Sequence, residues 1–138
     1  MAEIYYLDSC IWRDYFENRS DKFRPLGEWA FFLIKKIIKE SSLIIYSDLV
    51  EEELQTTYSE KEVEGIFSIV PKQVLIKVET SKEQLREAIQ LAKKLEIPVK
   101  DVLHAIIARN NNAILVTRDK HFYEIENGLI IKKPEELI

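Results

Sequence analysis

The chain has 138 residues, 46% of them hydrophobic, so it can bury one sizeable core but is too short for two comfortable domains. We therefore expect a single domain over residues 1–138. A net charge of −4 argues against a protein that holds nucleic acid by bulk charge alone, although a local basic rim stays open. A single cysteine excludes an internal disulfide, and no signal-peptide pattern or long apolar run is present. We therefore expect a cytoplasmic protein without a membrane segment.

The chain opens with an apolar run typical of a strand that is covered on both faces, and the run is interrupted by Asp8. Apolar residues at helical spacing then predict helices over residues 9–18, 26–40, 47–57, 60–70, 81–95 and 99–109. Further strands are expected over residues 43–46, 74–78, 113–117 and 129–131, the last at a sheet edge. Strands that alternate with helices indicate an α/β fold. We expect a three-layer α/β/α sandwich around a mostly parallel sheet of about five strands.

Two details of the helices can be predicted from capping and periodicity. Either Ser47 or Asp48 caps the helix that follows the second strand, and Asp48 with Glu51 matches a capping box. Ser81 is expected to cap the helix over residues 81–95. The core face of that helix is predicted to consist of Leu85, Ala88, Ile89, Ala92 and Leu95.

Two aspartates directly follow predicted core strands. Asp8 follows the first strand, and Asp119 follows the strand that ends near Thr117. In parallel sheets, ligands bind in the crevice beyond the carboxyl ends of the strands, so both carboxylates are expected there. Asp8 alone could equally be the N-cap of the next helix. Together, the two aspartates favour a shared acidic site.

A glutamate on the third predicted helix is expected to face inward. The apolar face of that helix consists of Leu49, Val50 and Leu54. With about 100° per residue, Glu53 lies about 40° from Leu49, whereas Glu51 and Glu52 point away from this face. An inward carboxylate is costly unless it is paired, protonated or bound to a cation. Glu53 is therefore the candidate ligand of this helix.

A third aspartate begins the helix over residues 99–109. One side of this helix is apolar and the other carries small residues, so we expect neighbours on both sides. Asp101 projects from its first turn, with His104 three residues later. Complementation of the helix dipole is the alternative role for Asp101. We expect His104 and His121 to be surface or supporting groups rather than catalysts.

The order and spacing of these acids resemble the PIN-domain family of nucleases, including the VapC-type toxin ribonucleases. The resemblance rests on four motifs that span nearly the whole chain: residues 6–9 (YLDS), 47–54 (SDLVEEEL), 100–105 (KDVLHA) and 116–122 (VTRDKHF). It implies that the acidic metal ligands and catalytic residues are Asp8, Glu53, Asp101 and Asp119. Ser9 and Thr117 would support them through hydrogen bonds. The chain departs from the family at His121, where many members carry another acid.

Oxygen ligands of this kind select Mg²⁺ or Mn²⁺. With the resemblance, they imply metal-dependent cleavage of phosphodiester bonds in single-stranded RNA. Four basic residues flank the expected crevice and are candidates for phosphate contacts: Arg13, Lys100, Arg118 and Lys120.

The resemblance also implies partners. For a toxin we expect a small antitoxin and a homodimer, with the aromatic segment at residues 29–32 as a contact surface. A housekeeping role in RNA processing fits as well. Two other classes stay open: a non-catalytic PIN-like scaffold that binds RNA or protein, and, ranked lower, a phosphohydrolase with Asp8 as nucleophile. The second would require an acid at the position of Cys10.

Overall fold

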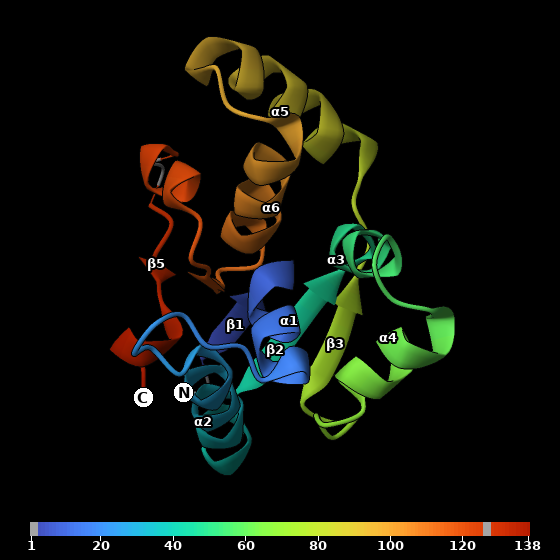
Figure 1. Cartoon of the computed structure of the whole chain (residues 1–138). Helices are drawn as coiled ribbons and strands as arrows, with labels where there is room; N and C mark the ends of the chain where they lie inside the picture. The colour runs from blue at the N-terminus through green and yellow to red at the C-terminus, as the bar shows by residue number, and fades with distance from the viewer. Residues whose placement is uncertain (1–2, 126–127) are drawn as a thin grey trace.

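A five-stranded parallel sheet forms the centre of the molecule (Figure 1), as described by a computed structural model for residues 3–125 and 128–138. The strand order is β3-β2-β1-β4-β5, and every neighbouring pair runs parallel. The strands are β1 (Ile4–Leu7), β2 (Leu43–Ser47), β3 (Leu75–Val78), β4 (Ile114–Val116) and β5 (Ile131–Lys132). The predicted parallel α/β fold is confirmed, and the last strand lies at an edge as expected.

The helices form the outer layers. They are α1 (Ser9–Glu17), α2 (Leu26–Lys39), α3 (Asp48–Gln55), α4 (Glu60–Phe67), α5 (Lys82–Leu95) and α6 (Val99–Asn110), with short 3₁₀ segments η1 (Lys120–Glu124) and η2 (Pro134–Glu136). Because crossovers between parallel strands are right-handed, the helices before β3 lie on one face of the sheet and α5 and α6 on the other. Contacts agree, since α1 packs on α2 and α3, whereas α5 packs on α6. None of the helices in the described ranges is long and apolar enough to cross a membrane.

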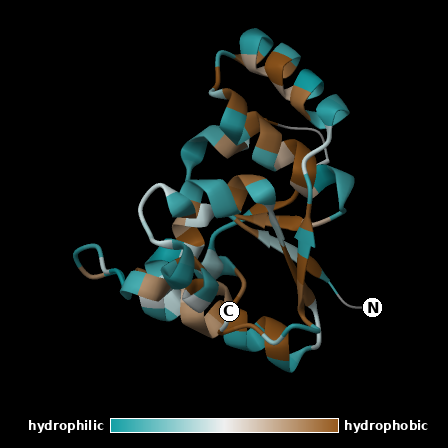
Figure 2. Cartoon of the chain, turned by 90° about the vertical axis from the view of Figure 1, so that its right-hand side faces the viewer, coloured by the Kyte–Doolittle hydropathy of each residue, from teal (hydrophilic) through white to brown (hydrophobic). Residues whose placement is uncertain are grey.

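The core lies on both faces of the sheet. Strand β1 is buried from Tyr5 to Leu7, and helix α6 is buried continuously from Val102 to Ala108. Figure 2 shows the strands largely in hydrophobic colours, while α5 at the top alternates between both colours. Helix α6 is therefore covered on both sides, as its sequence predicts.

The structure decides between the two possible caps of α3 and corrects the predicted core face of α5. Ser47, not Asp48, caps α3, because its hydroxyl accepts a hydrogen bond from Val50 N; Asp48 instead accepts from Thr80. In α5 the predicted core residues Leu85 and Ile89 are 43% and 41% exposed. The reason is that α5 lies beyond α6, far from the sheet in Figure 1, and its main contact is with α6.

The strand order places the site. From β1 the chain continues to β2 on one side, whereas β4 lies on the other side, so the order reverses between β1 and β4. Such a switch point opens a crevice at the carboxyl ends of the strands. Leu7 pairs with Val116, and Asp8 N donates to Val116 O at 3.0 Å. The residues that follow β1 and β4 therefore meet at one edge of the sheet.

Candidate active site

Asp8 is fixed at this switch point by hydrogen bonds from two segments. It is the N-cap of α1, where its Oδ1 accepts from Ser9 N at 2.8 Å. Its Oδ2 accepts from the Thr117 hydroxyl at 2.8 Å, and the same hydroxyl oxygen accepts from Asp119 N at 3.1 Å. Asp8 is only 7% exposed. Capping and a place in the crevice are thus compatible roles for one carboxylate.

Glu53 reaches the same crevice from α3. Its Oε1 lies 2.8 Å from Nε2 of the buried His104, and that nitrogen lies 3.9 Å from Asp8 Oδ1. Burial opposes ionisation of Glu53, but the hydrogen bond and the charge of His104 outweigh it, so the pKa of Glu53 is lowered. Burial likewise opposes protonation of His104, yet Glu53 and Asp8 raise its pKa. The carboxylate of Glu53 is therefore held in its charged form at the site.

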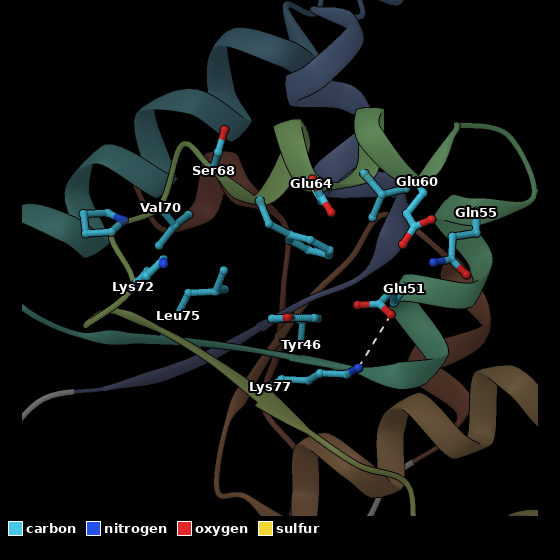
Figure 3. Close-up of a pocket in the computed structure, with 13 residues that line it drawn as sticks. Tyr46, Glu51, Gln55, Glu60, Glu64, Ser68, Val70, Lys72, Leu75 and Lys77 are labelled. Carbon is cyan, nitrogen blue, oxygen red and sulfur yellow. Dashed lines mark ion pairs between the residues drawn. The ribbon is translucent and has the colours of Figure 1, made fainter.

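The three consecutive glutamates of α3 have different environments. Figure 3 shows Glu51 pointing into a hollow between α3, α4 and β3, toward Lys77, with which it forms a 3.5 Å ion pair. Glu52 is exposed. Of the three, Glu53 is the one that lies with Asp8 in a group able to hold a metal ion.

A second acidic group adjoins the first. His121 Nδ1 lies 3.1 Å from Asp101 Oδ2 and 3.4 Å from Asp119 Oδ1, and His121 N donates to Asp119 Oδ1 at 2.9 Å. Burial raises the pKa of Asp101, and the charges of Asp119 and Asp8 add to this, while the His121 hydrogen bond opposes it. The hydrogen bond to Asp101 in turn raises the pKa of His121. Burial and the neighbouring carboxylates thus disfavour the charged form of Asp101 more than His121 favours it.

The geometry fits divalent cations. Asp8, Glu53 and His104 each offer an atom within 4.8 Å of the others, and the same holds for Asp101, Asp119 and His121. Carboxylate oxygens predominate, which is the donor set of Mg²⁺ and Mn²⁺. The charge of Asp8 acts on Asp101, so the two groups belong to one electrostatic site. Burial is the main cause of the raised pKa of Asp101, and a cation bound there would offset both this burial and the smaller effect of the charges of Asp119 and Asp8.

The four basic residues predicted near the crevice differ in availability. Arg118 binds Asp14 at 3.2 Å and Glu135 at 3.1 Å, and its guanidinium lies over Trp29. Arg13 lies 4.0 Å from Glu17 on α1. Lys100 and Lys120 are exposed and form no ion pair within the described residues. The charge of Lys100 contributes to the lowered pKa of Glu53, so this lysine lies near the crevice.

A family model for the PIN domain matches residues 5–128, nearly the whole chain. The chain belongs to the PIN domain family. No curated protein matches it. Several solved structures are similar in fold, and the three described next are under 25% identical, so they show the shared fold alone.

Three of these structures illustrate the similarity. VapBC2 from Rickettsia felis, bound to a DNA fragment from its promoter, is 23% identical with a TM-score of 0.70, covering 94% of this chain and 98% of that one. VapC20 from Mycobacterium tuberculosis, described as a sarcin-ricin loop cleaving toxin, is 12% identical with a TM-score of 0.64, covering 88% and 93%. VapBC-1 from nontypeable Haemophilus influenzae is 16% identical with a TM-score of 0.64, covering 96% and 98%.

Sequence reasoning missed one part of the site in this PIN domain. Tyr6 Oη lies 2.7 Å from His104 Nδ1 and 2.7 Å from Ser47 Oγ, which ties His104 into the core. The sequence contains only a weak indication of this contact. His104 lies in a helix with apolar residues on one side and small residues on the other, where a buried polar side chain needs a hydrogen-bond partner. The partner is 98 residues away, so spacing alone could not identify it.

Proposed function

We propose that this PIN domain is a metal-dependent endoribonuclease that cleaves phosphodiester bonds of single-stranded RNA. The observation that carries the proposal is that two adjoining groups of possible ligands contain four carboxylates: Asp8 after β1 with Glu53 on α3, and Asp101 on α6 with Asp119 after β4. Membership of the PIN domain family supports nuclease chemistry. Since these acids come from segments distributed along the whole chain, their convergence is a property of the fold rather than of one acidic stretch.

Each acid has a role set by its surroundings. Asp8 and Glu53 would hold a Mg²⁺ or Mn²⁺ ion on the inner side of the crevice, with Ser9 and Thr117 fixing the orientation of Asp8. Asp101 and Asp119, beside His121, would complete the ligand set nearer the surface. When bound, the metal supplies activation of water and stabilisation of charge on the phosphoryl oxygens. The described side chains thus hold charge and orientation for hydrolysis, with no covalent step on the protein.

The substrate proposal rests on charge at the rim. Lys100 on α6 directly precedes Asp101, Lys120 on η1 directly follows Asp119, and both lysines are exposed, so phosphates of a single strand could reach them. The structurally similar VapC20 is described as a sarcin-ricin loop cleaving toxin, which supports an RNA substrate. Arg118 and Arg13 lie in ion pairs and are secondary candidates.

We also propose that the chain is the toxin of a toxin-antitoxin pair and forms a homodimer. The VapBC and FitAB structures that resemble it, and a toxin-antitoxin complex from Klebsiella pneumoniae, support an antitoxin partner. On α2, Phe31 is 36% exposed and Phe32 is 48% exposed, and Phe31 stacks on Tyr15. This aromatic surface is the candidate contact for the partner. Light scattering behind a sizing column would test the dimer, which predicts twice the chain mass.

The test of the activity is cleavage of a labelled pool of single-stranded RNA in Mg²⁺, Mn²⁺ or EDTA. The native chain is compared with Asp8→Asn and Asp101→Asn, purified identically so that contaminating ribonucleases are equal. We expect metal-dependent cleavage by the native chain and a loss of at least about 100-fold in both variants, as for removal of a group that stabilises the transition state.

Glu52→Gln is the matched control, because Glu52 is an exposed acid on the same helix as Glu53. We expect it to cleave like the native chain, while Glu53→Gln falls with the aspartate variants. Equal cleavage by native and variant proteins, together with calorimetry that detects no Mn²⁺ binding, would overturn the nuclease proposal in favour of a non-catalytic scaffold.

A further inference from the structure

A chain of buried polar groups leads from the core of the molecule to Glu53. Ser47 Oγ and Tyr6 Oη are 2.7 Å apart, Tyr6 Oη and His104 Nδ1 are 2.7 Å apart, and His104 Nε2 lies 2.8 Å from Glu53 Oε1. Ser47 and Tyr6 are 0% exposed and His104 is 1% exposed. The sequence of contacts joins β2, β1, α6 and α3. We call this chain of four residues the Tyr6–His104 relay.

The relay closes on the helix that carries Glu53. Ser47 Oγ accepts a hydrogen bond from Val50 N at 3.2 Å and so caps α3. Glu53 stands one turn further along the same helix. The start of α3 and its functional side chain are therefore both fixed to the same buried tyrosine and histidine. A shift of Glu53 would require movement of groups that have no water to replace their partners.

The raised pKa of His104 favours its charged form, in which Nδ1–H donates to Tyr6 Oη, Tyr6 donates to Ser47 Oγ, and Nε2–H donates to Glu53. In the neutral form, Nε2–H still donates to Glu53 and the hydrogen bonds on the Tyr6 side reverse their direction. Val50 N donates to Ser47 Oγ in both forms. Every polar atom in both arrangements is used, which buried groups require. Both ring nitrogens are occupied, so His104 orients Glu53 rather than binding a metal itself. Partners of this kind fix the tautomer of a histidine and the position of a ligand.

We propose that Tyr6 and His104 are positioning residues that hold Glu53 in its metal-binding orientation. The inference rests on the proposed function, because it takes Glu53 as a metal ligand. It assigns a role to Tyr6, which contacts neither Asp8 nor any other proposed ligand through a side-chain hydrogen bond among the described residues. Loss of the Tyr6 hydroxyl leaves Nδ1 without its hydrogen-bond partner, so the ring is no longer held in one orientation, and in its neutral form it can also take the tautomer that turns a lone pair toward Glu53. The carboxylate would then lose its donor and its fixed position.

The first experiment measures Mn²⁺ affinity of Tyr6→Phe by calorimetry without RNA. We expect binding to weaken about 10-fold, the lower end of the usual cost of losing such a partner. The matched control is Tyr5→Phe, which removes a hydroxyl from the neighbouring residue of the same strand. The Tyr5 hydroxyl has no side-chain hydrogen bond in residues 3–125 and 128–138, so this variant should bind Mn²⁺ like the native chain.

A second pair of variants separates positioning from general packing. His104→Gln can place an amide N–H near Nε2 and keep the bond to Glu53, whereas His104→Asn is too short and reaches only toward Tyr6. Both lose the same buried ring, so a merely structural role predicts equal effects. We expect His104→Gln to bind Mn²⁺ within about 3-fold of the native chain and His104→Asn to bind it about 10-fold more weakly. Circular dichroism checks that each variant is folded.

The outcomes distinguish this inference from the proposed function. If the native chain does not bind Mn²⁺, both fail. If the native chain binds Mn²⁺ and Tyr6→Phe binds it equally well, the relay is overturned while the nuclease proposal stands. Equal weakening in the Gln and Asn variants at position 104 would likewise overturn positioning. Should Tyr6→Phe fail to fold, the comparison at position 104 decides.

Discussion

Asp101 shows how a single side chain records the charge balance of the site. Burial and the charges of Asp119 and Asp8 raise its pKa, and the hydrogen bond from His121 only partly compensates. Its ionised form is therefore disfavoured in the folded chain relative to the unfolded chain. Such an arrangement is a common cost of function, because removing the charge would stabilise the metal-free fold while removing a ligand.

This raised pKa makes a prediction about stability and pH. Between the unfolded pKa of about 3.9 and the higher folded value, the folded chain binds more protons at Asp101, so its free energy of unfolding falls as pH rises. Asp101→Asn carries an amide that does not titrate, so this contribution to the pH dependence of its stability is absent. In EDTA, we expect the stability of the variant relative to the native chain to increase from pH 3.5 to pH 7. Urea unfolding at several pH values measures it.

Glu83→Gln is the control for that experiment, since Glu83 is also an acid in the first turn of a helix but lies on α5, away from the site. Its stability relative to the native chain should not follow the same trend. A constant difference between Asp101→Asn and the native chain across this pH range would contradict the charge crowding.

His121 makes a prediction about the metal. Its Nδ1 lies beside Asp101 and Asp119. At this position many members of the PIN domain family carry a carboxylate instead. Imidazole nitrogen suits Mn²⁺ better than Mg²⁺. We expect the native chain to bind Mn²⁺ more tightly than Mg²⁺, and His121→Asp to reduce the ratio of the two affinities by roughly 10-fold. Calorimetric titrations with each metal measure the ratio, and an unchanged ratio would exclude nitrogen ligation.

For single residues, the sequence predicted where the acids lie better than which side chains contact one another. Asp8 and Asp119 follow strands, so their shared edge could be inferred from topology, and the helical angle separated Glu53 from its neighbours. The contact between Tyr6 and His104 could not be predicted, because tyrosine in a buried strand and histidine in a helix are each ordinary. Only the three-dimensional fold brings their polar atoms together.

Helix packing gives a prediction at the scale of elements. Gly27, at the start of α2, lies against the end of α1, where an added Cβ would come within 2.5 Å of Asn18 Cα and 2.7 Å of Asp14 O. Both atoms belong to the backbone, so relieving the clash would require a shift of the main chain at the end of α1. Alanine usually stabilises a helix by about 1 kcal/mol relative to glycine, but here the clash should dominate. We expect Gly27→Ala to lower the free energy of unfolding by about 1–3 kcal/mol in chemical denaturation.

Gly65→Ala in α4 is the matched control, with a stability change expected in the opposite direction. An added Cβ there meets nothing within 4 Å, so helix propensity acts alone. We expect this variant to be more stable by up to about 1 kcal/mol. If both alanines shift stability in the same direction, the close approach of α1 and α2 is not the reason for glycine at position 27.

The same elements show where sequence patterns reach their limit. Strands and helices were placed within a few residues because their apolar periods are strong. The periodicity of α5 gave a wrong prediction for Leu85 and Ile89, which have core spacing but are exposed because the helix packs mainly on α6. Ser47 and Asp48 were equivalent as caps in the sequence. The choice depended on Thr80, which binds Asp48 from a distant loop.

At the scale of the whole molecule, the parallel sheet and its switch point hold four acids near one another despite the repulsion between their charges. A bound cation should therefore stabilise the fold. With free Mn²⁺ at about 100 times its dissociation constant, linkage predicts about 2.7 kcal/mol of added stability, a rise of roughly 10 °C in Tm for a chain of this size. Salt screening alone also weakens repulsion, so NaCl of equal ionic strength is the necessary control. We expect NaCl to give less than half of the Mn²⁺ effect, EDTA to reverse the latter, and the double variant Asp8→Asn/Asp101→Asn to lose it. Equal shifts with NaCl and Mn²⁺ would mean that the four carboxylates respond to ionic strength alone and do not form a metal site.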